Sequence, residues 1–164
     1  MQGKVSWLNL HLFVVKDVRK LIFKKLTLLE RIIVEYSHGN PALFEKHKNY
    51  ICVYAAAEGH LEVLKWVRQN GCPWNKRTCA YAALGGNLEV LKWARQNGCP
   101  WDNLTCENAA RGGHLEVLKW ARQNGCPWDE FTSFYAEKEG NLEVLKWARE
   151  NGCPCIGLIC TYLW

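Results

Sequence analysis

The feature that most constrains the fold of this 164-residue chain is an internal repeat. The segment HLEVLKWARQNGCPW at residues 114–128 recurs with few changes at residues 60–74, 87–101 and 141–155, so successive copies lie 27 residues apart. A fixed period of this kind is typical of stacked repeat units. It defines four units, at residues 48–74, 75–101, 102–128 and 129–155, and a partial fifth unit at residues 156–164.

Each unit is predicted to form two helices. The first starts after a side chain that can accept a hydrogen bond from a free backbone N–H group, namely Asn75, Asp102 or Asp129. The second starts after a corner residue and ends before a glycine that tolerates the left-handed conformation, with a proline two residues later. The corner residues are His60, Asn87, His114 and Asn141. Because imidazole and amide alternate there, we expect a helix-capping hydrogen bond and not catalysis.

The second helix is apolar on two sides. In the third unit, its apolar residues cover roughly 220° of the helix, more than a single stripe. These residues are Leu115, Val117, Leu118, Trp120 and Ala121. One unit cannot cover both sides, so we expect the units to stack and to bury this helix, its tryptophan included. The remaining arc is expected to face water and holds Glu116, Lys119, Arg122 and Gln123.

The segments EGHLEVLKW after YAAA and RGGHLEVLKW after ENAA resemble the core of ankyrin repeats. The resemblance covers residues 48–155 and implies an all-α, ankyrin-like solenoid of helical pairs that binds a partner protein. Ankyrin units are about 33 residues long, and the missing residues fall where the family places a β-hairpin. The Thr-Pro-Leu-His start of the family is also absent. The segment LKWARQNGCPWD is similar to hairpin-poor arrays of large DNA viruses of protists and of some algae.

Residues 1–47 differ in composition and are predicted to form an N-terminal helical cap. Asp17 can cap a first helix, Thr27 and Glu30 form a capping box for a second that ends near Gly39, and Asn40-Pro41 opens a third. The segment KDVRKLIFKKLTLLERIIV resembles the start of an F-box, which docks onto the linker subunit of cullin ubiquitin ligases, although the leading Leu-Pro is absent. The alternative function is therefore a ubiquitin-ligase adaptor, in which residues 14–47 bind the linker subunit and the array binds the target.

The nine cysteines mostly occupy fixed positions of the repeat. One column precedes a proline, at Cys72, Cys99, Cys126 and Cys153, and another holds Cys52, Cys79, Cys106 and Ser133. A thiol that is copied in each unit and replaced by serine is typical of a small buried residue. Haem ligation by Cys-Pro and zinc binding are the alternatives, but zinc requires converging ligand pairs. We predict no cofactor and no metal, and a reducing compartment: the cytoplasm, that of the host for a viral protein, or the nucleus.

Charge and motifs argue against several function classes. The net charge is +5, and the second helices carry a ridge of Lys and Arg interleaved with Glu. We interpret this ridge as a solvated outer face and not as a nucleic-acid surface. No apolar run is long enough to span a membrane, and no metalloprotease motif, phosphate-binding loop or nucleophile elbow occurs. The sequence therefore predicts a binding protein and not an enzyme.

Positions that differ between otherwise identical units cluster in the first helix. Stacking does not dictate these residues, so they either carry specificity or drifted after duplication at exposed sites. In ankyrin repeats the corresponding concave face binds partners, and aromatic and arginine side chains often anchor interfaces. The predicted protein-binding residues are Tyr50, Tyr54, Lys76, Arg77, Tyr81, Asn103, Glu107, Asn108, Arg111, Glu130, Phe134, Tyr135 and Lys138.

Residues 156–164 form an apolar half unit, whereas terminal repeats usually have a polar outer face. Three interpretations follow. The segment is a last helix that leaves an apolar patch, a surface for self-association, or the product of a truncated copy of a longer gene.

Overall fold

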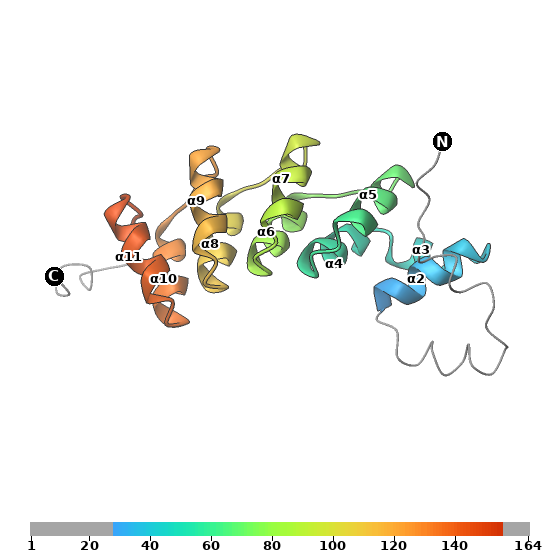
Figure 1. Ribbon diagram of the computed structural model, residues 1–164, viewed down its shortest axis with the longest axis horizontal. Helices are drawn as coiled ribbons and strands as arrows, with labels where there is room; N and C mark the ends of the chain where they lie inside the picture. The colour runs from blue at the N-terminus through green and yellow to red at the C-terminus, as the bar shows by residue number, and fades with distance from the viewer. Residues whose placement is uncertain (1–27, 156–164) are drawn as a thin grey trace. The chain divides into compact units, whose positions relative to one another are not determined.

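The computed structural model describes residues 28–155, and this part of the chain forms helices and no β-strand (Figure 1). The predicted all-α fold is therefore confirmed. The chain divides into two compact units, residues 1–48 and 49–164. None of the helices at residues 28–155 combines the length and the apolar character needed to span a bilayer.

Two helices of the first compact unit are described, α2 (Leu28–Ser37) and α3 (Ala42–His47). Phe44 of α3 is buried and packs against the ring of Tyr36 of α2, with 4.5 Å between the ring centroids. Gly39 has a φ of +79° and lies in the turn where the sequence predicts the end of a helix. The helix predicted before residue 28 lies outside the described residues.

The described part of the second compact unit, residues 49–155, contains four helical pairs, so the predicted two helices per repeat are confirmed there (Figure 1). The first helices of the pairs are α4 (Ile51–Ala57), α6 (Lys76–Leu84), α8 (Asn103–Arg111) and α10 (Glu130–Lys138). The second helices are α5 (Leu61–Gln69), α7 (Leu88–Gln96), α9 (Leu115–Gln123) and α11 (Leu142–Glu150).

The predicted N-terminal caps of the first helices are present in two of three cases. Asn75 Oδ1 accepts from the N–H of Arg77 at 2.9 Å, and Asp129 Oδ1 accepts from the N–H of Phe131 at 3.1 Å. The prediction for Asp102 is wrong, because its side chain makes no capping hydrogen bond. Asp102 Oδ2 lies instead 2.7 Å from Lys76 Nζ of the preceding unit. An ion pair between units has replaced the local cap.

Each second helix ends in the glycine turn that the sequence predicts. After α7, Gly98 has a φ of +82°, and the N–H of Cys99 donates to the carbonyl of Ala94 at 2.9 Å. This bond from beyond the helix end satisfies a carbonyl that would otherwise lack a partner. The other units repeat the turn with similar φ values at Gly71, Gly125 and Gly152.

The units stack mainly through their first helices. Successive first helices, α4 to α6, α6 to α8 and α8 to α10, make the most extensive contacts between units. The alanine pair of α6, Ala82 and Ala83, is fully buried. Small side chains allow this close approach, as the sequence predicts.

The tryptophans of the second helices are less buried than predicted. Val117 and Leu118 are buried as expected, but Trp120 is only half-buried. Its ring packs edge to face against Trp101 of the preceding unit, with 5.9 Å between the ring centroids. Because neighbouring units pack most closely through their first helices, the second helices leave part of each indole exposed.

The arginine of the second helix does not simply face water as predicted. Arg122 is half-buried, and its Nη1 donates to the carbonyl of Cys126. Its guanidinium carbon lies 4.1 Å from the ring centroid of Trp128. Arginine stacks well on indole because the planar cation meets the negative face of the ring. The side chain therefore fastens the connection to the next unit.

The outer end of the described stack is polar. Ala83 and Ala110 are buried between units, whereas the fourth unit has the exposed Glu137 at this position. Glu137 Oε2 accepts from Arg149 Nη2 at 3.2 Å. Residues 156–164, for which the sequence left three interpretations, lie outside the described residues.

Candidate functional site

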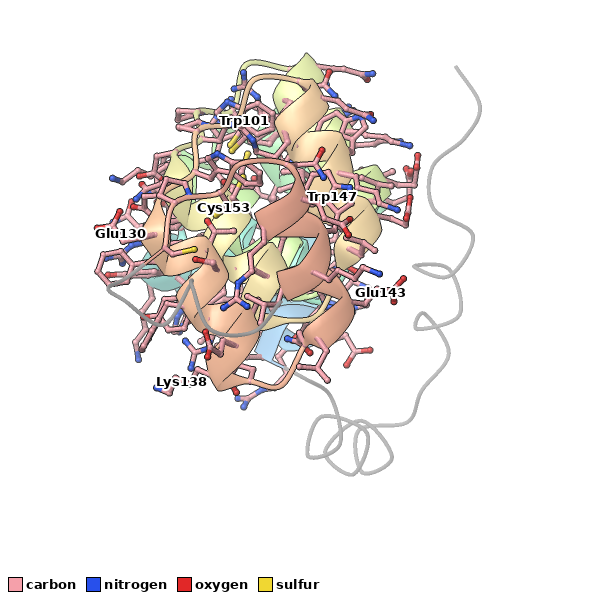
Figure 2. All side chains as sticks on the ribbon, turned by 90° about the vertical axis from the view of Figure 1, so that its left-hand side faces the viewer. Trp101, Glu130, Lys138, Glu143, Trp147 and Cys153 are labelled. Carbon is pink, nitrogen blue, oxygen red and sulfur yellow. The ribbon has the colours of Figure 1, made fainter. Side chains whose placement is uncertain are left out.

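The variable positions form one surface along α4, α6, α8 and α10, which we call the first-helix face. In α10 they are residues 130, 131, 134, 135 and 138, a spacing that places them on one side of a helix. Figure 2 shows Glu130 and Lys138 on one side of the array, and Glu143 and Trp147 of α11 on the other. The first helices thus present a surface separate from that of the second helices.

The structure places twelve of the thirteen predicted binding residues at least partly at the surface. Eight are exposed: Tyr50, Tyr54, Lys76, Arg77, Tyr81, Arg111, Phe134 and Lys138. Four are half-buried: Asn103, Asn108, Glu130 and Tyr135. Glu107 is buried, with 7% of its surface exposed, and thus offers little contact area.

An aromatic cluster on α10 consists of Phe131, Phe134 and Tyr135. Their ring centroids lie 5.3–6.5 Å apart, and Phe131 and Phe134 are 43% and 40% exposed. Arg111 of α8 places its guanidinium carbon 5.5 Å from the Tyr135 ring centroid and its Nε 3.6 Å from Glu139. Phe131 was not among the predicted residues. A phenylalanine at a variable position of a largely polar helix was the signal for it.

A second aromatic group, the tyrosine group, lies on the first two units. Tyr50 and Tyr54 of the first unit are 52% and 38% exposed, and Tyr81 of α6 is 41% exposed. Tyr54 and Tyr81 occupy the same repeat position, and α4 packs against α6. The structure therefore presents two phenol rings at equivalent places on adjacent helices.

An acidic cluster lies on the third unit and at the start of α10 in the fourth. The amide of Asn103 donates to Glu107 Oε1 at 2.9 Å and to Asp129 Oδ2 at 2.5 Å. Burial raises the pKa of Glu107, and the nearby carboxylates raise it further. Among residues 28–155, Lys76 is the one cation paired with the cluster, through its contact with Asp102. The cluster consists of Asp102, Glu107, Asp129 and Glu130.

The corner residues hold adjacent units together. Asn87 Nδ2 donates to the carbonyls of Ala56 and Ala57, both at 2.9 Å, at the end of α4. His114 Nε2 lies 3.0 Å from the carbonyl of Leu84 at the end of α6. Neither side chain caps the start of its own second helix, where the sequence predicts the hydrogen bond. Each bonds instead to the end of the first helix of the preceding unit.

The repeated cysteines are buried, as predicted. Cys79, Cys99, Cys106 and Cys126 are fully buried, and Ser133 replaces the thiol with 3% exposure. Burial raises the pKa of Cys52 to about 12, with the nearby Cys72 adding to the effect. In the second unit the interaction between the two neighbouring thiols, together with burial, raises the pKa of Cys79, and the same interaction lowers that of Cys99. These positions show the environment of core residues and not that of exposed nucleophiles.

The structure bears on one of the alternative functions, metal binding, and leaves the F-box-like adaptor untested. At residues 28–155, no group of three or more His, Cys, Asp or Glu side chains converges in a way that could hold a metal ion. Most of the F-box-like segment lies before residue 28, outside the described residues. The ubiquitin-ligase adaptor and the viral type of array remain predictions.

Comparison with known proteins identifies the repeat. A family model described as ankyrin repeats (many copies) matches residues 52–95 and 79–122. No curated protein matches the chain. The matched residues include the stacked pairs from α4 to α9 and the corner hydrogen bonds between them. Residues 52–122 of this chain are therefore ankyrin repeats.

Proposed function

We propose that this protein is a non-catalytic scaffold that binds a partner protein through the first-helix face. Ankyrin repeats are protein–protein interaction modules, and proteins built from them are generally binding scaffolds. The observation that carries the proposal is the exposure of large aromatic rings along one face, at Tyr54, Tyr81, Phe131 and Phe134. Exposed apolar rings in neighbouring positions favour association, because a partner can remove them from water.

The chemistry of the face defines the kind of partner that would fit it. Exposed aromatic side chains lie on the first, second and fourth units, and the acidic cluster lies on the third unit and at the start of α10. A complementary surface has apolar residues opposite the rings and a lysine or arginine opposite the acidic cluster. Charge complementarity of this kind mainly speeds association and selects partners, whereas the buried rings supply most of the affinity.

Affinity purification from cells that express the protein tests the proposal. The variant Y54A/Y81A/F131A/F134A removes the exposed rings. The control E62Q/E89Q/E116Q/E143Q changes four exposed residues of the second helices. We expect the control to retain the proteins that the wild-type chain captures and the ring variant to lose them. Equal capture by both variants contradicts the proposal, provided that both have the helical circular dichroism of the wild-type chain.

The alternative, a ubiquitin-ligase adaptor, rests on the sequence resemblance of the N-terminal segment. It requires residues 14–47 to bind the ligase linker subunit while the array binds the target. A pull-down with that subunit, compared between the wild-type chain and L21D/I22D, tests it. Capture that is lost in the variant while the array stays folded supports the adaptor, and no capture by the wild-type chain eliminates it.

We further propose that the protein works in a reducing compartment, the cytoplasm or the nucleus. The described thiols Cys52, Cys79, Cys99 and Cys106 are buried and are not joined in disulfides. Alkylation of the protein in cell extracts before reduction, followed by mass spectrometry, tests this location. We expect these four thiols to be alkylated once the protein is unfolded, and disulfides among them would contradict the proposal.

A further inference from the structure

Two grooves lie between second helices of adjacent units, away from the first-helix face. One is at the junction of the first and second units and has a volume of about 370 Å³, and the other is at the junction of the third and fourth and has about 500 Å³. The first groove is lined by Lys65, Arg68, Gln69, Trp74, Trp93 and Asn97. The second is lined by the equivalent residues two units later. Both grooves therefore arise from the same positions of the repeat.

The packing of the array explains why the grooves exist. Units pack most closely through their first helices, so the second helices leave space between them. Within that space, the ring centroids of Trp74 and Trp93 lie 5.8 Å apart in an edge-to-face arrangement, and those of Trp128 and Trp147 lie 6.0 Å apart. Packed indoles in matching positions give each groove the same aromatic wall.

Each groove is positively charged. Its lining includes two cations and no carboxylate. Lys65 is paired with Glu62 at 2.7 Å outside the groove. Arg68 has no acidic partner among the described residues: its Nη1 donates to the carbonyl of Cys72, and its guanidinium carbon lies 4.1 Å from the ring centroid of Trp74. The stack holds the guanidinium in place at the wall of the groove.

We propose that these grooves bind the carboxylate side chains of an extended acidic segment of a partner protein. A guanidinium that is fixed on an aromatic ring is preorganised to donate to a carboxylate. The same stack covers a face of the indole that a nucleobase would need, which favours an acidic peptide over single-stranded nucleic acid. This site is distinct from the first-helix face and does not depend on the function proposed for that face.

The middle junction extends the site along the array. Arg95 lies over Trp101 at 4.2 Å, and Trp101 packs against Trp120 with 5.9 Å between the ring centroids. A regular series of cationic positions suits a linear polyanion, because each contact raises the effective concentration for the next. Beyond the last junction the charge changes, since Glu150 replaces the glutamine of the other units and Arg149 is paired with Glu137.

The glutamine column provides the variant that tests the proposal. Q69E/Q96E/Q123E adds acidic groups beside the arginines, and Glu150 shows that this position of the repeat accepts a carboxylate. The matched control R31Q/K46Q/N49D changes the net charge equally but alters exposed residues that belong neither to the grooves nor to the first-helix face. Binding of a fluorescein-labelled oligoglutamate peptide to the full chain is measured by fluorescence anisotropy at low ionic strength.

We expect the wild-type chain and the control to bind the peptide alike, and the glutamate variant to bind about tenfold or more weakly because like charges repel across the contact. Circular dichroism verifies that all three proteins are folded. Three results overturn the proposal. They are no binding by the wild-type chain, equal weakening in both variants, and tighter binding of an oligothymidylate of similar charge with the same dependence on the glutamine column.

Discussion

At the scale of single residues, the corner position shows how one side chain joins two units. Asn87 uses both hydrogens of its amide to bond two carbonyls at the end of α4. His114 bonds the equivalent end of α6 through one ring nitrogen. Both residues supply a donor to backbone carbonyls that the helix leaves without partners. The alternation between histidine and asparagine therefore preserves a donor and not a particular side chain.

This role predicts different results for two substitutions of Asn87. Asn87→Asp replaces the donor by an acceptor that faces two carbonyl oxygens, and it should lower the free energy of unfolding by about 1–3 kcal/mol. Asn87→His, the residue that the third unit carries at this position, should cost clearly less. Urea unfolding followed by circular dichroism measures both. Equal stability of the two variants would show that the donor is unimportant.

Glu107 gives a prediction with a definite pH dependence. Because burial raises its pKa, the folded protein holds this proton more tightly than the unfolded chain does. The charged carboxylate therefore costs stability above the folded-state pKa, and the cost disappears as the pH falls towards the unfolded value of about 4.3. Glu107→Gln should raise the free energy of unfolding at pH 7 by up to about 1 kcal/mol, with the gain vanishing near pH 4.

Urea unfolding at the two pH values measures this gain. The control is Glu116→Gln, since the Glu116 side chain is 76% exposed and lies 2.9 Å from Lys119. We expect a small effect for this control at pH 7. A wild-type chain that is more stable than Glu107→Gln at neutral pH would contradict the interpretation.

At the scale of helices, the sequence correctly predicted the helix ends that depend on neighbouring residues in the chain. The ends of the second helices follow from glycine and proline, which act on their own backbone, and these ends were correct. The cap at Asp102 was wrong because its carboxylate binds Lys76 of the preceding unit. Whether Asp102 caps its own helix or pairs with Lys76 depends on the distance between units, and the repeat pattern of the sequence does not give this distance.

The distance between helices also explains what the sequence missed in the candidate site. The variable positions were correctly expected on the first helix, yet Glu107 is buried by its neighbours. The half-exposure of Trp120 and the stacking of Arg122 on Trp128 depend on how far apart the second helices lie. Apolar periodicity indicates which side of a helix is covered, but not how completely.

The close approach of the first helices predicts the effect of a larger side chain at Gly112. This glycine has an ordinary φ of −77°, so the cost of a substitution is steric. A Cβ atom there would lie 2.6 Å from the carbonyl oxygen of Leu84 and 2.5 Å from His114 Cδ2. Gly112→Ala should therefore destabilise the array by about 1–3 kcal/mol through overpacking.

Thermal unfolding measures this change, and the chain offers a control at the same repeat position. The fourth unit carries Glu139 there, so Glu139→Ala adds no atom and removes only the partly exposed contact with Arg111. We expect its midpoint to stay near that of the wild-type chain. A Gly112→Ala protein as stable as this control would contradict the proposed contact.

At the scale of the whole molecule, the residues that are the same in every unit and the residues that differ between units lie on different surfaces. The second helices are nearly identical, and they carry arginines that stack on the indoles of the following turns. The first helices share only the small buried residues of their packing side, and their exposed side differs from unit to unit. A repeat that is fixed where units meet can change elsewhere without loss of the fold. This division is the basis for assigning recognition to the first-helix face.

Site-specific photo-crosslinking tests this central claim most directly. The photoreactive residue p-benzoylphenylalanine is placed at Tyr81 or Phe134 of the first-helix face, or at the exposed Glu89 or Glu143 of the second helices. After irradiation in an extract of cells that express the protein, we predict the same partner adduct from Tyr81 and Phe134 and no such adduct from Glu89 or Glu143. An adduct that forms only from the second helices, or equally from both faces, would contradict the account.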